Sequence, residues 1–493
     1  MKTELVVKFE FTKSLPKDSE TKIKGFIKEL QKKVKDVKVS EQLKGETLLI
    51  NLKTGQDYPT DFIVQLDRKV KEFFGRDFKV GTKDYIITDY SLDLELEQNV
   101  PKLTIPFVDH LEIAGRQVKI HYNKLDKSFI EDHRIERTVK LIQDKVKQSN
   151  YQGKDEFKEY VWGGKKRKEV YSGDPTEDLE KKGWIKRTGA KGQFIFGREI
   201  TALINVFKEL MIENIYEPLD FKEMIFPKFE PWSVPKKSGH AKNVYSNAYF
   251  IMVPKEASTE YWQEVMDEYA ITHEINEEKI KEKTTNVGIM SYAQCPPFWP
   301  YIEKKTIDNN SLPIKVYDWS GPTYRNESGG VKGLDRLEEF HRTETLWVAE
   351  KKEEIKIWKE VAESFKKLFD KVLDIEVKMA RVTPWWMAHA GVKTDKGSEE
   401  VGTFDFDAFL PYRGREKEWL EIQNASSNGT KYPEAFNVSM QKGELFSGCA
   451  GGSFERWVAA FLGQKGLDPK NWPEEIKKRF IKKIKGIKEL KLY

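Results

Sequence analysis

A polar, glycine-rich stretch near residues 150–187 separates two parts of the chain that have different sequence patterns. A chain of 493 residues is longer than one hydrophobic core usually organises, so a division of this kind is expected. We therefore predict an N-terminal domain over residues 1–165, a linker over residues 166–187 and a larger second domain over residues 188–493.

Strand-like and helix-like patterns alternate in the N-terminal part. Val7, Phe9 and Phe11 recur at every second position, as in a half-buried strand. The next apolar residues recur at helical spacing: Ile23, Phe26, Ile27, Leu30 and Val34. The same succession follows once more, which predicts a small α+β domain. Its many lysines would suit a nucleic acid, although a lysine-rich helix face is more often simply solvated.

The charge balance and the cysteine count exclude several classes of protein. The chain has 85 lysines and arginines against 80 aspartates and glutamates, a net charge of +5. This excludes a histone-like protein and leaves open a nucleic-acid partner that meets a local basic face. No apolar run of about 18 residues occurs, and the N-terminus lacks the apolar stretch of a signal peptide. With only two cysteines, these features predict a cytoplasmic protein that has no membrane partner.

The second part has longer apolar segments interrupted by proline and glycine, which predicts many strands and connecting loops. Residues 255–286 are predicted to form two short polar helices. Several common signatures of enzyme sites are missing from the sequence, among them GxxxxGK[ST], GxSxG, HExxH and CxxC. Any chemistry therefore has to come from less familiar groups of residues.

Cys295 and Cys449 are candidate metal ligands. Cys295 follows a strand-like run and precedes two prolines, so its thiol is expected at the edge of an element. Imidazole is the commoner partner of thiolate on zinc, and the residues alone leave His240, His341 and His389 open as a third ligand. The alternative is that each cysteine is a small buried apolar residue.

Residues 323–348 are predicted to form a β-hairpin with a long loop. Arg325 and Glu327 lie two positions apart and therefore on one face of a strand, and Arg336 and Phe340 return beside them. Guanidinium groups match phosphate oxygens, a carboxylate accepts from an adenine amino group, and a phenyl ring stacks on a base. The set fits a nucleotide, with an ordinary charged hairpin as the alternative.

The segment ELFSGCAGGSFERWVAAFLGQKG, residues 444–466, predicts a strand, a glycine-rich turn and a helix. Glu455 and Arg456 would lie in the first turn of that helix, where an arginine is placed to meet a triphosphate. Small residues allow backbones to pack closely, so plain strand-to-helix packing is the alternative.

Taken in order, the Arg-x-Glu hairpin and the glycine-rich strand followed by Glu-Arg resemble motifs 2 and 3 of class II aminoacyl-tRNA synthetases. The segments KKSGHAKNVY, IMSYAQCPPFW and EWLEIQNASSNGTKYPEAFNV are similar to those of the archaeal, methanogen-type (type-2) seryl-tRNA synthetases. The resemblance implies an α+β fold in which a mostly antiparallel sheet with flanking helices carries the catalytic site. It also implies a smaller α+β N-terminal domain that binds tRNA, a helical insertion near residues 255–286 and a homodimer.

By this resemblance the hairpin and the helix after the glycine-rich strand hold ATP. Arg325 would grip the α-phosphate and the substrate carboxylate, and Glu327 would accept from the adenine amino group. Arg336 would bind the distal phosphates, Phe340 the adenine face and Arg456 the triphosphate from the other side. These roles agree with what the residue types suggest by themselves.

The same resemblance implies a serine pocket and a magnesium site next to the nucleotide. Leu337 joins the nucleotide-binding residues, and Glu421 would hold the magnesium ion that bridges the phosphates. Asn424 would reach the serine hydroxyl, while Arg342 and the backbone near Ala293 would line the pocket.

A zinc ion, one per subunit, is implied at Cys295, Glu344 and Cys449, with an open position for the amino group of serine. Trp385 and His389 lie in TPWWMAHAG, the place of a loop that orders over bound serine in this family. Glutamine is expected where His389 stands, so closure over serine is expected to be altered.

The implied reaction has two steps, formation of seryl-adenylate from L-serine and ATP and transfer of serine to the 3′ end of tRNA(Ser). Whether tRNA(Sec) is also charged stays open. Two other interpretations also remain: a paralogue that binds without charging tRNA, and a class II enzyme specific for another amino acid such as threonine or cysteine.

Overall fold

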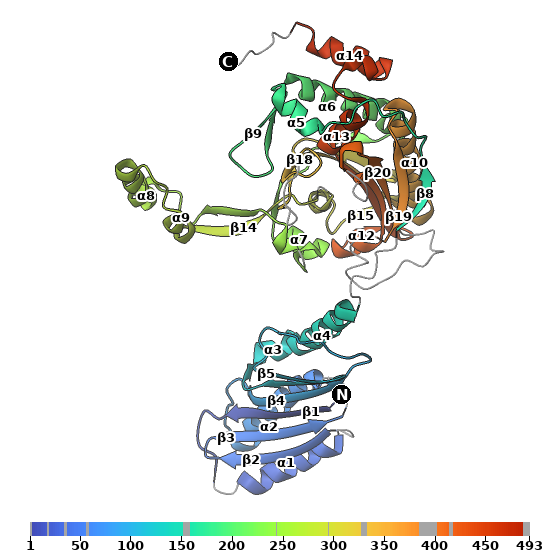
Figure 1. Ribbon diagram of the computed structural model, residues 1–493. Coiled ribbons are helices and arrows are strands. Elements are labelled where there is room, and N and C mark those ends of the chain that lie inside the picture. Colours follow the sequence, from blue (N-terminus) through green and yellow to red (C-terminus); the bar gives the residue numbers. More distant parts are fainter. Residues whose placement is uncertain are drawn as a thin grey trace. The chain divides into compact units, whose positions relative to one another are not determined.

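The structure, a computed structural model, forms two compact units (Figure 1). It describes residues 2–16, 19–33, 37–55, 59–150, 158–242, 244–293, 295–326, 333–383, 402–413 and 418–486. The first unit comprises the described residues up to 150, and the second comprises those from 158 onward.

The first unit is an antiparallel sheet with helices. Its strands are β1 (Lys2–Glu10), β2 (Val37–Lys44), β3 (Thr47–Thr54), β4 (Ile86–Glu95), β5 (His110–Ala114), β6 (Gln117–Tyr122) and β7 (Leu125–Asp126). Its helices are α1 (Ser19–Lys33), α2 (Thr60–Phe78), α3 (Lys127–Glu131) and α4 (Arg134–Asn150). The strand order is β2-β3-β1-β4-β6-β5, and β7 pairs with β4.

Period-two alternation decides which face of this sheet is buried. In β1, Leu5, Val7 and Phe9 are at most 2% exposed, whereas the residues between them are partly or fully exposed. The buried face packs with apolar residues of α1, α2 and α4 in one core. An antiparallel sheet covered on one face produces this pattern, so the predicted α+β character is confirmed.

The second unit is built around a larger sheet, which among the described residues has nine strands. They are β8 (Lys158–Gly163), β11 (Lys222–Glu223), β16 (Ile314–Asp318), β17 (Pro322–Tyr324), β18 (Glu339–Glu350), β19 (Val377–Val382), β20 (Gly402–Phe409), β21 (Trp419–Gly429) and β23 (Leu445–Ser453). The order is β11-β16-β18-β23-β21-β20-β19-β8, with β17 on β18. The β11–β16 pair is parallel and the others are antiparallel, as expected for a mostly antiparallel sheet.

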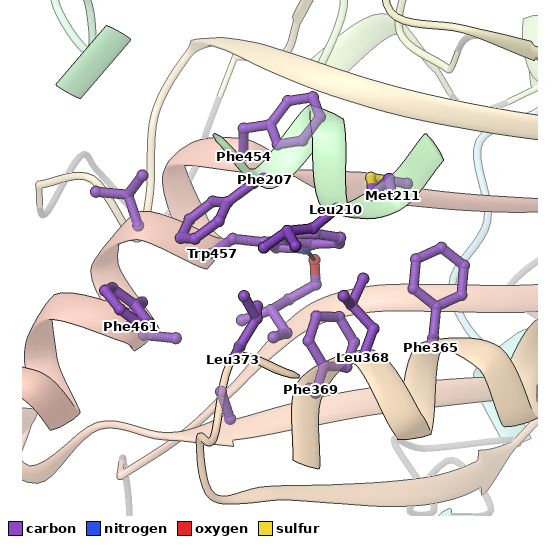
Figure 2. Close-up of a cluster of buried hydrophobic side chains, with 14 of the residues drawn as sticks. Phe207, Leu210, Met211, Phe365, Leu368, Phe369, Leu373, Phe454, Trp457 and Phe461 are labelled. Atoms are coloured by element: carbon purple, nitrogen blue, oxygen red, sulfur yellow. Dashed lines mark hydrogen bonds between the residues drawn. The ribbon is translucent and has the colours of Figure 1, made fainter. Parts of the chain in front are cut away.

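Three helices seal one face of this sheet. These are α6 (Arg198–Met211), α10 (Lys351–Lys367) and α13 (Phe454–Lys465). Figure 2 shows where they meet, around the indole of Trp457, whose ring centroid lies 4.9 Å from that of Phe369. The Trp457 Nε1–H also donates to Ile422 O at 3.1 Å, which ties α13 to β21. The opposite face of the sheet is not covered by these three helices.

Smaller elements complete the second unit. They are α5 (Pro175–Lys181), β9 (Ile185–Arg187), β10 (Phe194–Phe196), β12 (Phe229–Pro231), α7 (Ser233–Ser238), β13 (Phe250–Pro254), α8 (Thr259–Thr272), α9 (Glu277–Lys283), β14 (Thr284–Met290), β15 (Thr306–Ile307), α12 (Lys431–Ala435), β22 (Ser439–Met440) and α14 (Glu474–Ile484). The pair of helices predicted within residues 255–286 is confirmed as α8 and α9.

The start of this unit differs from the predicted domain ranges in two ways. Strand β8, which lies within the range 1–165 predicted for the N-terminal domain, pairs with β19 at the edge of the larger sheet. The range 166–187, predicted as a linker, contains α5 and β9. Among the residues that the structure describes, no helix is both long and apolar enough to cross a membrane.

Candidate active site

A cavity of about 350 Å³ opens on the face of the larger sheet opposite α6, α10 and α13. Its walls come from β18, β20, β21 and β23, from the end of β19, from the first turns of α12 and α13, and from the segments around residues 292–295, 325 and 334–337. It brings together eleven residues singled out from the sequence: His240, Ala293, Cys295, Arg325, Leu337, Phe340, Arg342, Glu421, Asn424, Cys449 and Arg456.

Alternation along β18 sends its side chains to two different environments. Trp347 on one face of the strand belongs to the core under the helices, whereas Leu346 on the other face belongs to a separate cluster with Cys295. Arg342 and Glu344 share the face of Leu346, because residues two positions apart in a strand point the same way. The predicted hairpin is confirmed, since Tyr324 of β17 pairs with Glu339 of β18.

The glycine-rich turn predicted near residue 450 is wrong, because these glycines lie inside β23 and the chain passes directly into α13. A Cβ on Gly451 would lie 2.0 Å from Arg342 Nη2, and one on Gly452 would lie 2.0 Å from Gln423 Oε1. The glycines therefore allow neighbouring side chains to cross the strand. Ser453 caps the helix by accepting from Arg456 N–H at 3.3 Å.

Two thiols of the cavity wall, those of Cys295 and Cys449, lie close to the buried carboxylate of Glu344, which is not itself a lining residue. One potential ligand atom from each of Cys295, Glu344 and Cys449 lies within 4.8 Å of the others. Glu344 is fully buried, and its Oε2 accepts from Arg342 Nε at 2.9 Å, while its Oε1 has no donor at hydrogen-bonding geometry. Asn428 Nδ2 donates to the Cys449 sulfur at 3.4 Å. This buried donor set fits a metal ion.

The ionisation of this group is consistent with such an ion. The adjacent Cys449 thiol and burial raise the pKa of Cys295 above its ordinary value. Burial also raises the pKa of Glu344, although the Arg342 guanidinium opposes the effect. A bound cation would favour the deprotonated forms of all three groups, which are the forms that coordinate metals.

Arginines and polar groups occupy the other side of the cavity. The Arg325 guanidinium lies 4.5 Å from the ring centroid of Tyr292. Arg456 Nη1 donates to the carbonyl oxygen of Glu421 at 2.8 Å. Asn424 accepts at Oδ1 from the Gly451 N–H at 3.2 Å. Arg325, Arg456 and Glu421 all line this cavity, and guanidinium groups together with a carboxylate can bind an anion and its cation.

Of the histidines considered as metal ligands, neither His240 nor His341 belongs to the group formed by Cys295, Glu344 and Cys449. His240 lines the cavity, where burial together with Lys431 and Arg325 lowers its pKa to about 3, so the ring is neutral. His341 Nδ1 lies 2.7 Å from Glu455 Oε1 instead. His389 lies outside the described residues.

Some predicted site residues are not part of the described cavity wall. Arg336 is half-buried beside it, between the wall residues Asp335 and Leu337. Glu327 and Trp385 lie outside the described residues.

Several polar residues of the wall were not predicted from the sequence: Asp335, Asp405, Ser426, Asn428 and Tyr432. A signal for two of them was present, because Ser426 and Asn428 follow Asn424 at intervals of two along β21 and therefore share its face. Tyr432 and Asp405 carry no such signal, since only the packing of α12 and β20 brings them here.

Two family descriptions match this chain. One is "tRNA-binding domain", over residues 1–144. The other is "tRNA synthetase class II core domain (G, H, P, S and T)", over residues 279–465, which contains most of the cavity wall.

Individual relatives agree with these matches. The type-2 serine–tRNA ligase of Methanococcoides burtonii is 41% identical over 87% of this chain and 86% of its own. That of Methanothrix thermoacetophila is 39% identical over the same shares. A crystal structure of M. kandleri SerRS in complex with A. aeolicus tRNASec superposes with a TM-score of 0.89 at 26% identity, covering 100% of this chain and 98% of that one. The chain therefore belongs to the type-2 serine–tRNA ligases, a family of class II aminoacyl-tRNA synthetases.

Proposed function

We propose that this chain is a zinc-dependent seryl-tRNA synthetase, which activates L-serine with ATP and transfers it to tRNA(Ser). One observation carries the proposal: Cys295 and Cys449 line the same cavity as Arg325 and Arg456, and a potential ligand atom of Glu344 lies within 4.8 Å of those of both thiols. A site for an amino group thus adjoins a site for phosphates, as an amino acid and ATP require.

In the first step the serine carboxylate attacks the α-phosphorus of ATP, a new oxygen–phosphorus bond forms and the bond to pyrophosphate breaks. Arg325 holds the α-phosphate and the serine carboxylate. Arg336 binds the distal phosphates, and Arg456 neutralises the triphosphate from the other side. Positioning and charge neutralisation dominate such chemistry. In the second step a hydroxyl of the terminal ribose of the tRNA attacks the acyl carbon, and AMP leaves.

The adenine and the magnesium ion are held by the remaining nucleotide residues. Phe340 stacks on the base next to Leu337, and Glu327 accepts from the adenine amino group. Glu421 supplies the hard carboxylate oxygen that magnesium prefers, and the ion accompanies ATP. The position of Glu421 beside Arg456 supports this role.

Cys295, Glu344 and Cys449 would hold the zinc ion, which when bound would supply a Lewis acid for the α-amino group of an amino acid. Cys295 and Glu344 are buried and Cys449 is partly buried, which suits a site that excludes water. Arg342 orients Glu344 through its 2.9 Å hydrogen bond. This arrangement supports recognition of an amino acid by its amino group.

Selection of serine falls to the residues around the side chain. Asn424 binds the hydroxyl, and Ala293 and Arg342 line the pocket. The resemblance to the family assigns Trp385 and His389 to the segment that orders over bound serine. A pocket wall distinguishes threonine from serine only through a clash with one extra methyl group, so threonine is the demanding competitor.

The N-terminal unit binds tRNA through shape and phosphate contacts. The match of residues 1–144 to a tRNA-binding domain supports this role. The M. kandleri relative was crystallised with tRNASec, so tRNA(Sec) is a second candidate acceptor. The functional form is a homodimer. The insertion that contains α8 and α9 contributes contacts between the two subunits.

Amino-acid-dependent ATP–pyrophosphate exchange, measured with each standard amino acid, tests the proposal. Metal content is measured on the same sample, with a chelated and zinc-reloaded sample as the matched control. We expect exchange with serine alone, about one zinc ion per chain, and loss and recovery of exchange on chelation and reloading.

The other outcomes discriminate between the alternatives. Exchange with threonine or cysteine in place of serine would preserve the fold and overturn the specificity. A folded, zinc-loaded chain that supports exchange with no amino acid would favour the paralogue that binds without charging tRNA.

A further inference from the structure

The return limb of the β17–β18 hairpin, residues 333–339, carries Arg336 and leads directly into Phe340. Both residues are proposed above to bind ATP. Leu334 and Leu337 are 1% and 4% exposed and belong to the main core of the second unit. The limb is therefore anchored, and its position depends on what it packs against.

Thr176 holds the beginning of the limb. Its Oγ1 accepts a 3.1 Å hydrogen bond from the Leu334 N–H, and the residue is 4% exposed. Gly333 has a φ of +124°, and a Cβ there would lie 2.5 Å from Thr176 Oγ1. The limb backbone thus touches this side chain directly. Asp174 Oδ1 in turn accepts from the Thr176 N–H at 2.8 Å, which fixes the first turn of α5.

Arg413 holds the middle of the limb. Its Nε and Nη2 lie 2.7 Å and 2.6 Å from Asp335 Oδ2. Asp335 is 4% exposed, so this charge pair is well shielded from water and geometrically defined. Asp335 immediately precedes Arg336, and its fixation limits the directions that Arg336 can take.

Gly192 holds the end of the limb. Its carbonyl oxygen accepts from the Glu338 N–H at 3.1 Å and from the Glu339 N–H at 3.4 Å. Glu339 begins β18 and immediately precedes Phe340. Thr176, Gly192 and Arg413 do not line the cavity, so any effect they have on a ligand passes through the limb.

We propose that Thr176, Gly192 and Arg413, here named the clamp residues, are positioning residues for ATP. They fix the backbone of the return limb so that Arg336 and Phe340 are preorganised for the nucleotide, and this rests on the proposed function in that ATP is the ligand. An unfixed limb has to be ordered at each binding event, and that ordering weakens affinity. Thr176 lies in the range that the sequence suggested as a linker, so that range contributes to nucleotide binding.

Thr176→Val tests the proposal most directly, because it removes the hydrogen-bond acceptor at nearly constant volume. The Kd of Mg-ATP in a calorimetric titration and the KM for ATP in exchange should both rise roughly ten-fold, since a buried N–H loses its partner. The KM for serine should change by less than about two-fold. Thr176→Ser keeps the hydroxyl acceptor and should retain the wild-type ATP affinity. Thr201→Val, at an exposed position of α6, is the matched control.

Arg413→Lys provides an independent variant, because lysine keeps the charge but cannot form the two contacts to Asp335. It should raise the KM for ATP selectively, and Arg187→Lys, at a surface pair with Glu180, is its control. If Thr176→Val does not fold, this variant decides the question.

A folded Thr176→Val protein with wild-type ATP affinity would overturn the proposal. Equal increases in the KM for ATP and for serine, together with a lower melting temperature, would assign the clamp residues a general structural role and overturn it as well. Direct ATP titration separates this from the proposed function. A wild-type chain that binds ATP but activates no serine overturns the proposed function alone, and the Thr176→Val titration still decides the clamp.

Discussion

The two units of this molecule use their interiors differently. Among the described residues of the first unit, the buried polar side chains are Thr3, Ser19, Thr54, Thr60 and Asp67. In the second unit, the buried carboxylates alone include Glu230, Asp318, Asp335, Glu338, Glu344, Glu354, Asp370, Asp407 and Glu455. Burial of a carboxylate destabilises a fold unless the group is paired. Of these nine carboxylates, Asp335 lines the cavity and Glu344 belongs to the donor set with Cys295 and Cys449, whereas Asp67 is the one buried carboxylate among the described residues of the first unit.

Two of these carboxylates show how a structural group differs from a functional one. Glu455 accepts from the His341 N–H at 2.9 Å and from the Ser453 hydroxyl at 2.8 Å, besides pairing with the His341 ring. Glu344 pairs with Arg342 through one oxygen and leaves the other without a donor. A buried oxygen left without a donor beside two thiols is consistent with a metal ligand, while a fully bonded carboxylate holds strand to helix.

The largest effect is expected from Cys295→Ala, which removes one of three ligands. Bound zinc should be lost, and serine-dependent exchange should fall roughly a thousand-fold, because loss of a direct ligand exceeds the effect of outer-shell changes. ATP affinity should be nearly unchanged. Metal analysis, exchange assays and ATP titration check these outcomes. Tyr432→Phe, which removes the hydroxyl 3.6 Å from the Cys295 sulfur but keeps the donor set, should retain zinc. Retention of zinc and activity by Cys295→Ala would contradict the assignment of Cys295 as a zinc ligand.

Leu52→Ala should distinguish the contributions of the two units to activity. Leu52 is 0% exposed in β3, and a cavity there should lower the free energy of unfolding of the first unit by about 2–5 kcal/mol. Serine-dependent exchange should stay at the wild-type level while aminoacylation of tRNA falls. Urea unfolding and the two activity assays measure this. Val64→Ala, at a position 39% exposed, is the control. An equal loss of exchange and aminoacylation would contradict the assignment of tRNA binding to the first unit and serine activation to the second.

Gly451→Ala should damage the cavity of the second unit without removing any ligand. The new Cβ would lie 2.0 Å from Arg342 Nη2, so Arg342 must move and Glu344 loses its orientation. Exchange should fall roughly a hundred-fold, as for loss of an outer-shell partner of a metal ligand. Gly75→Ala, where a Cβ meets nothing within 4 Å, should leave exchange unchanged. Wild-type exchange by Gly451→Ala would mean that Arg342 does not need its observed position.

The smallest effect concerns the pH dependence of the His341–Glu455 pair. The hydrogen bond with Glu455 raises the pKa of His341 above its ordinary value, although burial opposes it. A raised histidine pKa stabilises the fold fully below the unfolded value of about 6.5, and the contribution is lost as pH rises through the folded pKa. The His341 side chain is 41% exposed, so solvent screening limits the contribution to about 0.5 kcal/mol.

His341→Asn should therefore be less stable than the wild type at about pH 6, with the difference shrinking toward about pH 9. Urea unfolding across this range measures it. A difference that grows with pH would show that the pair does not contribute as a charged bridge.

Much of the fold follows from local patterns. The alternation of Val7 and Phe9 predicted β1, and helical spacing predicted the two helices within residues 255–286. The hairpin from Tyr324 to Phe340 was also predictable, because a strand, a glycine-containing loop and a returning strand are all local signals. Such features depend on neighbours within a few positions, where sequence period and backbone geometry coincide.

Features that depend on distant contacts were not visible in this way. The pairing of β8 with β19 joins residues more than two hundred positions apart, and the Thr176–Leu334 hydrogen bond spans 158. The glycines of β23 were assigned to a turn, because the sequence does not show that Arg342 and Gln423 need their space.

The sequence by itself determined which residue types were available for chemistry. These are two thiols, several separate arginines and alternating polar side chains on the strands. Family resemblance named Glu344 as the third ligand, whereas the residues alone favoured a histidine. Only the tertiary structure places Cys295, Glu344 and Cys449 within 4.8 Å of one another. The physical reason is that antiparallel pairing of β18 with β23 sets which residues share a face and a level of the sheet, and that register is a property of the whole fold.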